Sequence, residues 1–142
     1  MRRYDAGMSG TCQRMMPMLS VADLASSIAF YQDLLGGTEV FRFPDEDPEF
    51  VTLKLGESEL GIGPVADPPL HKQPQRPASG HRIELCVWVD DVDEVAERVR
   101  AAGAPVVMDP ADQPWGERCA FIEDPDGNLL LLTARVAEAA PS

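Results

Sequence analysis

Apolar and polar positions alternate along several short stretches in the first half of the chain. This period of two is typical of strands, and it predicts strands over 15–21, 39–43, 50–55 and 59–63. Between the first two strands the period changes to that of a helix, with an apolar stripe at Leu24, Ile28, Tyr31 and Leu35. Asp23 suits the helix N-cap and Gly36-Gly37 suits its end.

The same order of elements returns in the second half of the chain. A strand over 83–89 is followed by a helical stripe, by a strand that starts at 106–108 and by a hairpin over 119–132. The stripe is made by Val92, Val95, Ala96, Val99 and Ala102, with Asp91 as N-cap and Gly103 at the end. Val21-Ala22-Asp23 corresponds to Val89-Asp90-Asp91, and Leu35-Gly36 corresponds to Ala102-Gly103. An internal repeat of this kind predicts two copies of one supersecondary unit.

The repeat predicts an α+β fold of two βαβββ modules. Their curved mixed sheets would surround a cleft, and the helices would cover the outer faces. We place the modules at 15–64 and 82–135 and join them by a connector at 65–81, because residues 64–80 hold five prolines. A flexible lead at 1–14 and a tail at 136–142 complete one domain of this design.

The turn Asp124-Pro125-Asp126-Gly127-Asn128 organises the second module. Pro125 fixes its own φ for the first turn position, and Gly127 tolerates a positive φ. Leu129–Leu132, which follows, is apolar at every position, so both faces of that strand are predicted to be covered.

Charge and composition narrow the classes of partner. A net charge of −12 argues against binding a nucleic-acid backbone and favours attraction of cationic small molecules, although acidity can also serve solubility alone. No apolar run approaches the length of about 18 residues that a membrane span needs. The three cysteines, Cys12, Cys86 and Cys119, form no CxxC motif and are interpreted as buried thiols of a cytoplasmic protein.

Taken together, the paired modules, the Val-Ala-Asp-Leu-Ala-Ser-Ser-Ile-Ala-Phe-Tyr opening after the first strand, and Glu-Asp-Pro-Asp-Gly-Asn near the end resemble the vicinal oxygen chelate superfamily. This superfamily includes glyoxalase I, extradiol dioxygenases, fosfomycin-modifying enzymes and bleomycin-binding resistance proteins. The resemblance covers residues 15–134 and implies the fold. It implies less about function, because one scaffold hosts several chemistries.

The resemblance also implies where a metal would be held. Metal enzymes of the superfamily use His, Gln or Glu from the first and last strand of each module. The corresponding positions here are Met16, Glu84, Leu131 and, in the first module, Leu60 or Gly61. Glu84 alone has a side chain that binds such metals, and a catalytic site needs about three protein ligands. We therefore predict no metal, no other cofactor and no catalytic residue.

Strand alternation gathers a set of side chains on the faces opposite the helices. A cleft of this composition would suit a ligand that is partly aromatic, although the same groups could be core that fills the space between the sheets. Glu84 would then need a partner, which could be a ligand cation, Arg82, Arg118 or an ordered water. The predicted cleft residues are Met16, Met18, Phe41, Phe43, Glu84, Cys86, Trp88, Trp115, Phe121, Leu129 and Leu131.

Three hypotheses of function follow. The leading one is a binding protein, similar to the bleomycin-resistance branch, that sequesters a cationic or aromatic antibiotic or metabolite without catalysis. The second is a metal-dependent lyase or dioxygenase whose metal ligands lie at other positions than those given above. The third is a structural or regulatory module with a filled cleft. A homodimer is predicted, with each cleft lined by both subunits, because the 17-residue connector at 64–80 can reach across to a partner.

Overall fold

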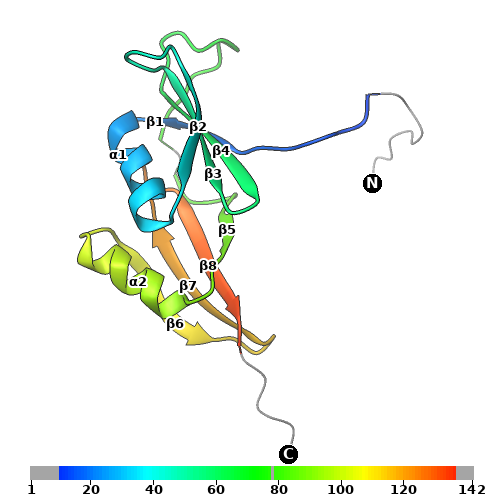
Figure 1. Cartoon of the computed structure of the whole chain (residues 1–142), viewed down its shortest axis with the longest axis vertical. Helices are drawn as coiled ribbons and strands as arrows, with labels where there is room; N and C mark the ends of the chain where they lie inside the picture. The colour runs from blue at the N-terminus through cyan, green and yellow to red at the C-terminus, as the bar shows by residue number, and fades with distance from the viewer. Residues whose placement is uncertain (1–9, 78, 137–142) are drawn as a thin grey trace, which may run out of the picture.

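The computed structural model describes residues 10–77 and 79–136 of the chain (Figure 1). The order of its elements is βαβββ in both halves, as the sequence predicts. The first module consists of β1 (Met18–Val21), α1 (Leu24–Ala29), the π-helix η1 (Phe30–Leu34), β2 (Thr38–Phe43), β3 (Phe50–Leu55) and β4 (Ser58–Pro64). The second consists of β5 (Leu85–Trp88), α2 (Val92–Ala101), β6 (Val106–Asp112), β7 (Glu117–Glu123) and β8 (Leu129–Arg135).

Each module forms one four-stranded mixed sheet. The strand order is β1-β4-β3-β2 in the first sheet and β5-β8-β7-β6 in the second. In both, the first strand pairs in parallel with the last strand of its module, and the other pairs are antiparallel. The helices of both modules lie on the same side of the molecule (Figure 1). The predicted α+β class is confirmed.

The core lies between the helices and the sheet faces that they cover. Val21, Tyr31, Val99, Leu130 and Leu132 are buried there, which confirms the predicted helix and strand faces. Ile28 is half-buried and packs against this core, so its face is also as predicted. The alternation of buried and exposed residues leaves the opposite face of each sheet without a helix on it.

Several strand boundaries differ from the predictions by one to four residues. β1 begins at Met18 rather than Met15, because Pro17 has no N–H for the ladder, although its carbonyl oxygen accepts from Gly61 N at 2.9 Å. β5 begins at Leu85, and Ile83 before it is 83% exposed. β6 continues to Asp112 despite Pro110, since it is an edge strand where proline is tolerated.

The first helix is not a single α-helix. It changes to a π-helix at Phe30, which widens the turn by one residue. Gly36, which ends it with φ +77°, stands 13 residues after the N-cap Asp23, whereas Gly103 stands 12 residues after Asp91 with φ +80°. The π-helix therefore absorbs one residue that the first copy of the repeat has and the second lacks.

The predicted turn joins the two modules. Gly127 has φ +80°, as predicted, and the Asp124 carboxylate before it is 3% exposed. That carboxylate accepts from the Tyr31 hydroxyl of the first module at 2.8 Å and from its own turn through Asp126 N at 3.0 Å, Asn128 N at 2.8 Å and Asn128 Nδ2 at 2.8 Å. Asp126 also accepts from Ala22 N at 2.9 Å, at the entrance to α1. Four donors satisfy a buried charge that would otherwise be costly.

We predict that Tyr31→Phe lowers the free energy of unfolding by about 1.5–3 kcal/mol, because it removes a hydrogen bond to a buried carboxylate. Urea unfolding at neutral pH measures this change. The matched control is a double-mutant cycle with Asp124→Asn, in which the two substitutions should be strongly non-additive. Additive effects would contradict a direct interaction between the two side chains.

The same residue gives a pH dependence. Burial raises the pKa of the Tyr31 hydroxyl, and the negative charge of Asp124 raises this pKa further. An unfolded tyrosine ionises at about pH 10, so the stabilisation is complete below that pH and is lost as the pH rises above it. Between about pH 9 and pH 11 the unfolding free energy of wild type should fall more steeply than that of Tyr31→Phe. Parallel curves would refute the assignment.

The turn gives a separate prediction. A Cβ at Gly127 would meet no atom within 4 Å, so Gly127→Val tests the left-handed backbone alone. Valine should destabilise the protein by about 1–2 kcal/mol, whereas Gly127→Asn should cost clearly less, because asparagine tolerates this conformation. Thermal unfolding of the two variants compares them, and equal losses would show that the positive φ is not the cause.

Candidate functional site

The predicted cleft residues lie on the open faces of the sheets, which the helices do not cover. Met18 is 65% exposed, Phe43 64%, Trp88 65% and Trp115 66%. Such exposure is unusual for large apolar side chains that share a face. In the single chain, these faces are therefore not covered by the chain's own side chains.

The open face of the first sheet is aromatic. Phe50 lies over Gly61: a Cβ built on that glycine would come within 2.8 Å of Phe50 Cζ and 3.2 Å of Met18 Cγ. The ring of Phe41 stands beside Phe50, with centroids 6.3 Å apart and planes tilted by 59°. Sequence reasoning named Phe41 and Met18 but missed Phe50, which pairs with Phe43 across the β2–β3 ladder and could have been found from that register.

The open face of the second sheet combines apolar and acidic groups. Cys86 pairs with Leu131 and Trp88 with Thr133 across the β5–β8 ladder. Phe121, Leu129 and Leu131 are half-buried on this face, and Phe121 pairs with Leu131. Trp115 is fixed by a hydrogen bond from its indole Nε1 to Glu117 Oε1 at 2.8 Å. Glu117 was not predicted, and no motif marks it.

The cysteines differ from the prediction of buried thiols. Cys119 is buried, with its Sγ 3.5 Å from Thr133 Oγ1, but Cys12 and Cys86 are exposed. Cys86 follows the alternation of an open face, which places it away from the core. Partial burial raises the pKa of the Cys86 thiol, and the nearby charges of Glu117 and Glu84 raise it further. The thiol is thus held in its protonated form, a weak nucleophile and a weak metal ligand.

Glu84 is also exposed, so its carboxylate does not need the buried partner that we expected. Arg118, one of the predicted partners, is bound elsewhere. Its Nε donates to Asp93 Oδ2 at 2.6 Å and its Nη1 to Asp112 Oδ1 at 3.0 Å. These carboxylates raise the pKa of Arg118, and the guanidinium lowers the pKa of Asp93. Arg118 therefore ties α2 to the sheet rather than serving the cleft.

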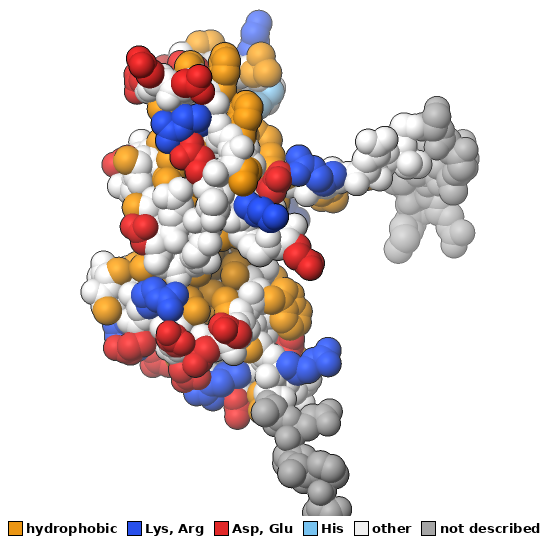
Figure 2. Space-filling model, viewed as in Figure 1, with side chains coloured by type: hydrophobic (Ala, Val, Ile, Leu, Met, Phe, Trp, Pro, Cys, Tyr) orange, Lys and Arg blue, Asp and Glu red, His pale blue; other side chains and the backbone are white. Residues whose placement is uncertain are grey.

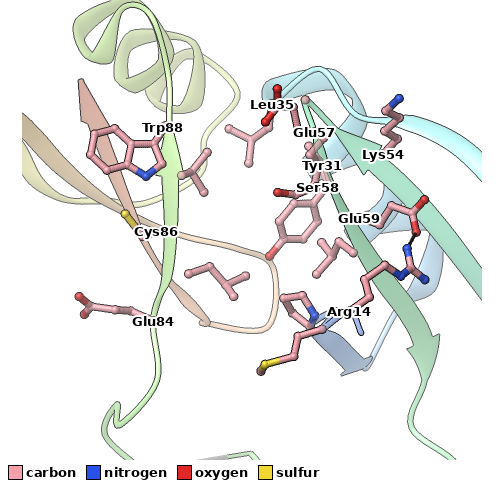
Figure 3. Close-up of a pocket in the computed structure, with 17 residues that line it drawn as sticks. Arg14, Tyr31, Leu35, Lys54, Glu57, Ser58, Glu59, Glu84, Cys86 and Trp88 are labelled. Atoms are coloured by element: carbon pink, nitrogen blue, oxygen red, sulfur yellow. Dashed lines mark hydrogen bonds and ion pairs between the residues drawn. The ribbon is translucent and has the colours of Figure 1, made fainter. Parts of the chain in front are cut away.

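A cleft of about 830 Å³ lies between the two modules (Figure 3). On one side it is bounded by β5 and the residue before it, and three of the predicted residues lie on this segment: Glu84, Cys86 and Trp88. The side chains of Glu84, Cys86 and Trp88 point away from Tyr31 and from the Arg14–Glu59 ion pair on the other side of the cleft (Figure 3). The remaining predicted residues do not line this cleft. Residues that line it without having been predicted are Arg14, Met15, Pro17, Tyr31, Leu35, Lys54, Leu55, Gly56, Glu57, Ser58, Glu59, Leu60, Leu85 and Val87.

Acidic side chains dominate part of the surface around the sheets. They gather over α2 and β6, with arginines between them (Figure 2). Arg100 pairs with Glu97 and Asp109, and Arg98 with Glu94. These are exposed pairs that contribute little each. The excess of carboxylates leaves a negative surface, as the net charge of −12 requires.

The structure settles which first-module residue corresponds to Leu131. Asp23 and Asp91 begin equivalent helices, so Met18 and Cys86 are equivalent, as are Met16 and Glu84. Met18 pairs with Gly61 as Cys86 pairs with Leu131. Gly61 is therefore the equivalent of Leu131 and lies on the open face, while Leu60 is 3% exposed in the core.

The residues at these four positions do not fit a divalent metal. Met16 offers a thioether, Leu131 a hydrocarbon chain and Gly61 no side chain, which leaves the Glu84 carboxylate. The two histidines of the chain, His71 and His81, are both exposed near the connector. Within residues 10–77 and 79–136, no three His, Cys, Asp or Glu side chains are grouped closely enough to hold an ion.

Comparison with known proteins identifies the family. The model of the Glyoxalase/Bleomycin resistance protein/Dioxygenase superfamily matches residues 14–132. The chain belongs to this superfamily. The match spans both modules and the connector, so the resemblance drawn from the repeat and the Asp-Pro-Asp-Gly-Asn turn is confirmed.

Individual members of the superfamily differ in their names. The chain is 37% identical to a lactoylglutathione lyase of Haemophilus influenzae over 117 residues. The aligned region covers 78% of this chain and 83% of that protein. It is 26% identical to TioX of Micromonospora sp. ML1, and the two structures superpose with a TM-score of 0.69. The superposition covers 90% of this chain and 100% of that chain. A superfamily enzyme of Burkholderia phytofirmans superposes with a TM-score of 0.74 at 25% identity, over 85% and 97% of the two chains. No helix in the described residues is long and apolar enough to cross a membrane.

Proposed function

We propose that the protein binds a small molecule and sequesters it without catalysis, and that the ligand is a cationic or aromatic antibiotic or metabolite. The observation that carries this proposal is the chemistry of the four positions where metal enzymes of the superfamily hold their ion. Three of them are Met16, Gly61 and Leu131, which cannot complete a catalytic metal site. Binding without a metal is the activity that these residues still allow.

The open faces support this class of ligand. Phe41, Phe50, Trp88 and Trp115 supply flat apolar surface, and methionine at position 18 adapts to an irregular shape. The acidic surface would attract a cation, and the carboxylates near Cys86 on the second sheet, Glu84 and Glu117, would orient it. A cytoplasmic location is part of the same proposal, since all three cysteines are free thiols.

The second candidate is a metal-dependent lyase. One observation favours it: a relative of 37% identity that is named lactoylglutathione lyase and is covered over 83% of its length. For this chain to act in the same way, residues other than those at positions 16, 61 and 131 would have to hold the ion. The charge and the aromatic faces would then serve a different substrate.

Metal analysis decides between the two candidates. We expect protein purified without chelator to contain less than about 0.1 equivalent of Zn, Ni, Mn or Fe, and stoichiometric metal would overturn the proposal. A thermal-shift screen against peptide, quinone and aminoglycoside antibiotics then identifies the ligand. At about 100 times its Kd, a ligand should add about 2.7 kcal/mol to the free energy of unfolding. Trp88→Ala, which removes an exposed indole from the face, should reduce that gain.

We further propose that the protein is a two-fold symmetric homodimer whose clefts are each lined by both subunits. β1 and β5 are edge strands of separate sheets, and the apolar faces beside them are uncovered. The segment that precedes β1 extends to one side of the chain (Figure 1), and its last residues contact the first module, where Arg14 pairs with Glu59. This extended segment, rather than the connector alone, is suited to contact a partner.

Light scattering at micromolar concentration should return about twice the mass of the 15.5 kDa chain. An obligate dimer of this kind should bury on the order of 2,000 Å² or more. A matched pair of variants locates the contact: Met15→Glu and Met18→Glu, both at exposed positions, should shift the protein toward monomer, while Leu70→Glu in the connector should not. A monomeric wild type would contradict this arrangement.

A further inference from the structure

The position of Gly61 shows more than the absence of a metal ligand, because the space above it is already filled. Among the described glycines, Gly61 is one whose missing Cβ would collide with a ring: 2.8 Å to Phe50 Cζ and 3.0 Å to Phe50 Cε2. Contacts this short are not found for real Cβ atoms, so any larger residue would require the ring to move. Gly61 is buried beneath it.

The ring of Phe50 is held in this place from several sides. Gly63, the next residue on the same face of β4, lies under the ring edge, with its built Cβ 3.7 Å from Phe50 Cδ2. Met18 Cγ lies 3.2 Å from the Cβ built on Gly61, and the centroid of the Phe41 ring lies 6.3 Å from that of Phe50. A flat side chain over two glycines packs closely against the backbone of a strand. The ring is therefore part of the sheet surface and not a loose cover.

We propose that Phe50 occupies the first module's half of the former metal position and bars a metal ion sterically, in addition to the missing ligands. A divalent ion needs donor atoms at about 2.0–2.6 Å, and a carboxylate extended from position 61 would have to pass through the volume of the ring. In the second module the equivalent position is filled by Leu131. This inference rests on the proposed function, since it describes why the same site does not use a metal.

Restoring the ligands, with and without the ring, tests the proposal. The starting variant carries Met16→His, Gly61→Glu and Leu131→Glu and keeps Glu84. Calorimetry with Zn²⁺ and metal content after dialysis are measured in the full chain. We expect this variant to bind Zn²⁺ weakly, and the addition of Phe50→Ala to strengthen binding roughly tenfold or more. Equal affinity with and without Phe50 would overturn the proposal.

The matched control replaces the neighbouring ring. Phe41→Ala removes an aromatic side chain from the same face, but the three atoms nearest to a Cβ built on Gly61 belong to Phe50 and Met18 and not to Phe41. In the starting variant this substitution should leave Zn²⁺ affinity unchanged within about twofold. If Phe41→Ala restores binding as well as Phe50→Ala does, general loosening of the sheet, and not the ring over Gly61, is responsible.

A second measurement covers the case in which the starting variant does not fold. Gly61→Ala should lower the urea midpoint in wild type and should lower it much less in a Phe50→Ala background, because the collision is then absent. The same loss in both backgrounds would overturn the proposal. The proposed function fails separately, through stoichiometric metal in the wild-type protein, so the two failures are distinguishable.

Discussion

The hydrogen bond from Tyr31 to Asp124 is the interaction on which the arrangement of the two modules depends. It joins residues 93 positions apart and is buried, with the carboxylate 3% exposed. A carboxylate in such a place must be satisfied by donors, and the turn after β7 supplies those that Tyr31 does not. The helices thus lie side by side, and the open sheet faces are left free of the chain's own helices (Figure 1).

This constraint explains why many of the predicted cleft residues lie on exposed faces. Each module can bury one face of its sheet under its helix, and the other face must be covered by something else. On the first sheet the ring of Phe50 lies over Gly61 on that face, and on the second sheet Leu131 and Trp88 line it. In this member of the superfamily, the open faces present aromatic and aliphatic surface, and the chain carries a net charge of −12.

The fold could be predicted from the sequence because its signals are local and repeated. Asp23 and Asp91 cap the helices, Gly127 takes the positive φ of the turn, and the periods of two and 3.6 identify the elements. The site could be predicted only in part. Strand alternation placed Trp88 and Met18 on open faces, but their exposure depends on how the modules pack, which no local pattern encodes.

The site predictions that were wrong or incomplete have the same physical origin. Glu84 and Cys86 were expected to be buried because strand patterns do not reveal whether a second layer covers a face. The intermodule cleft was not predicted in full, since residues such as Lys54 and Glu57 belong to a hairpin that meets β5 only in three dimensions. Phe50 was missed because the reason for its position lies on another strand, at Gly61.

The π-helix has a consequence for how the two halves recognise each other. One additional residue in the first copy changes the direction in which the following side chains project, as a shift of one position turns a helix by about 100°. Tyr31 lies in this widened turn and meets the turn of the other copy. The second copy has the shorter helix, so the duplicated halves are no longer interchangeable. Their contact is directional, with the hydroxyl donor on one half and the carboxylate acceptor on the other. Two halves with the same order of elements are thereby distinguished from each other.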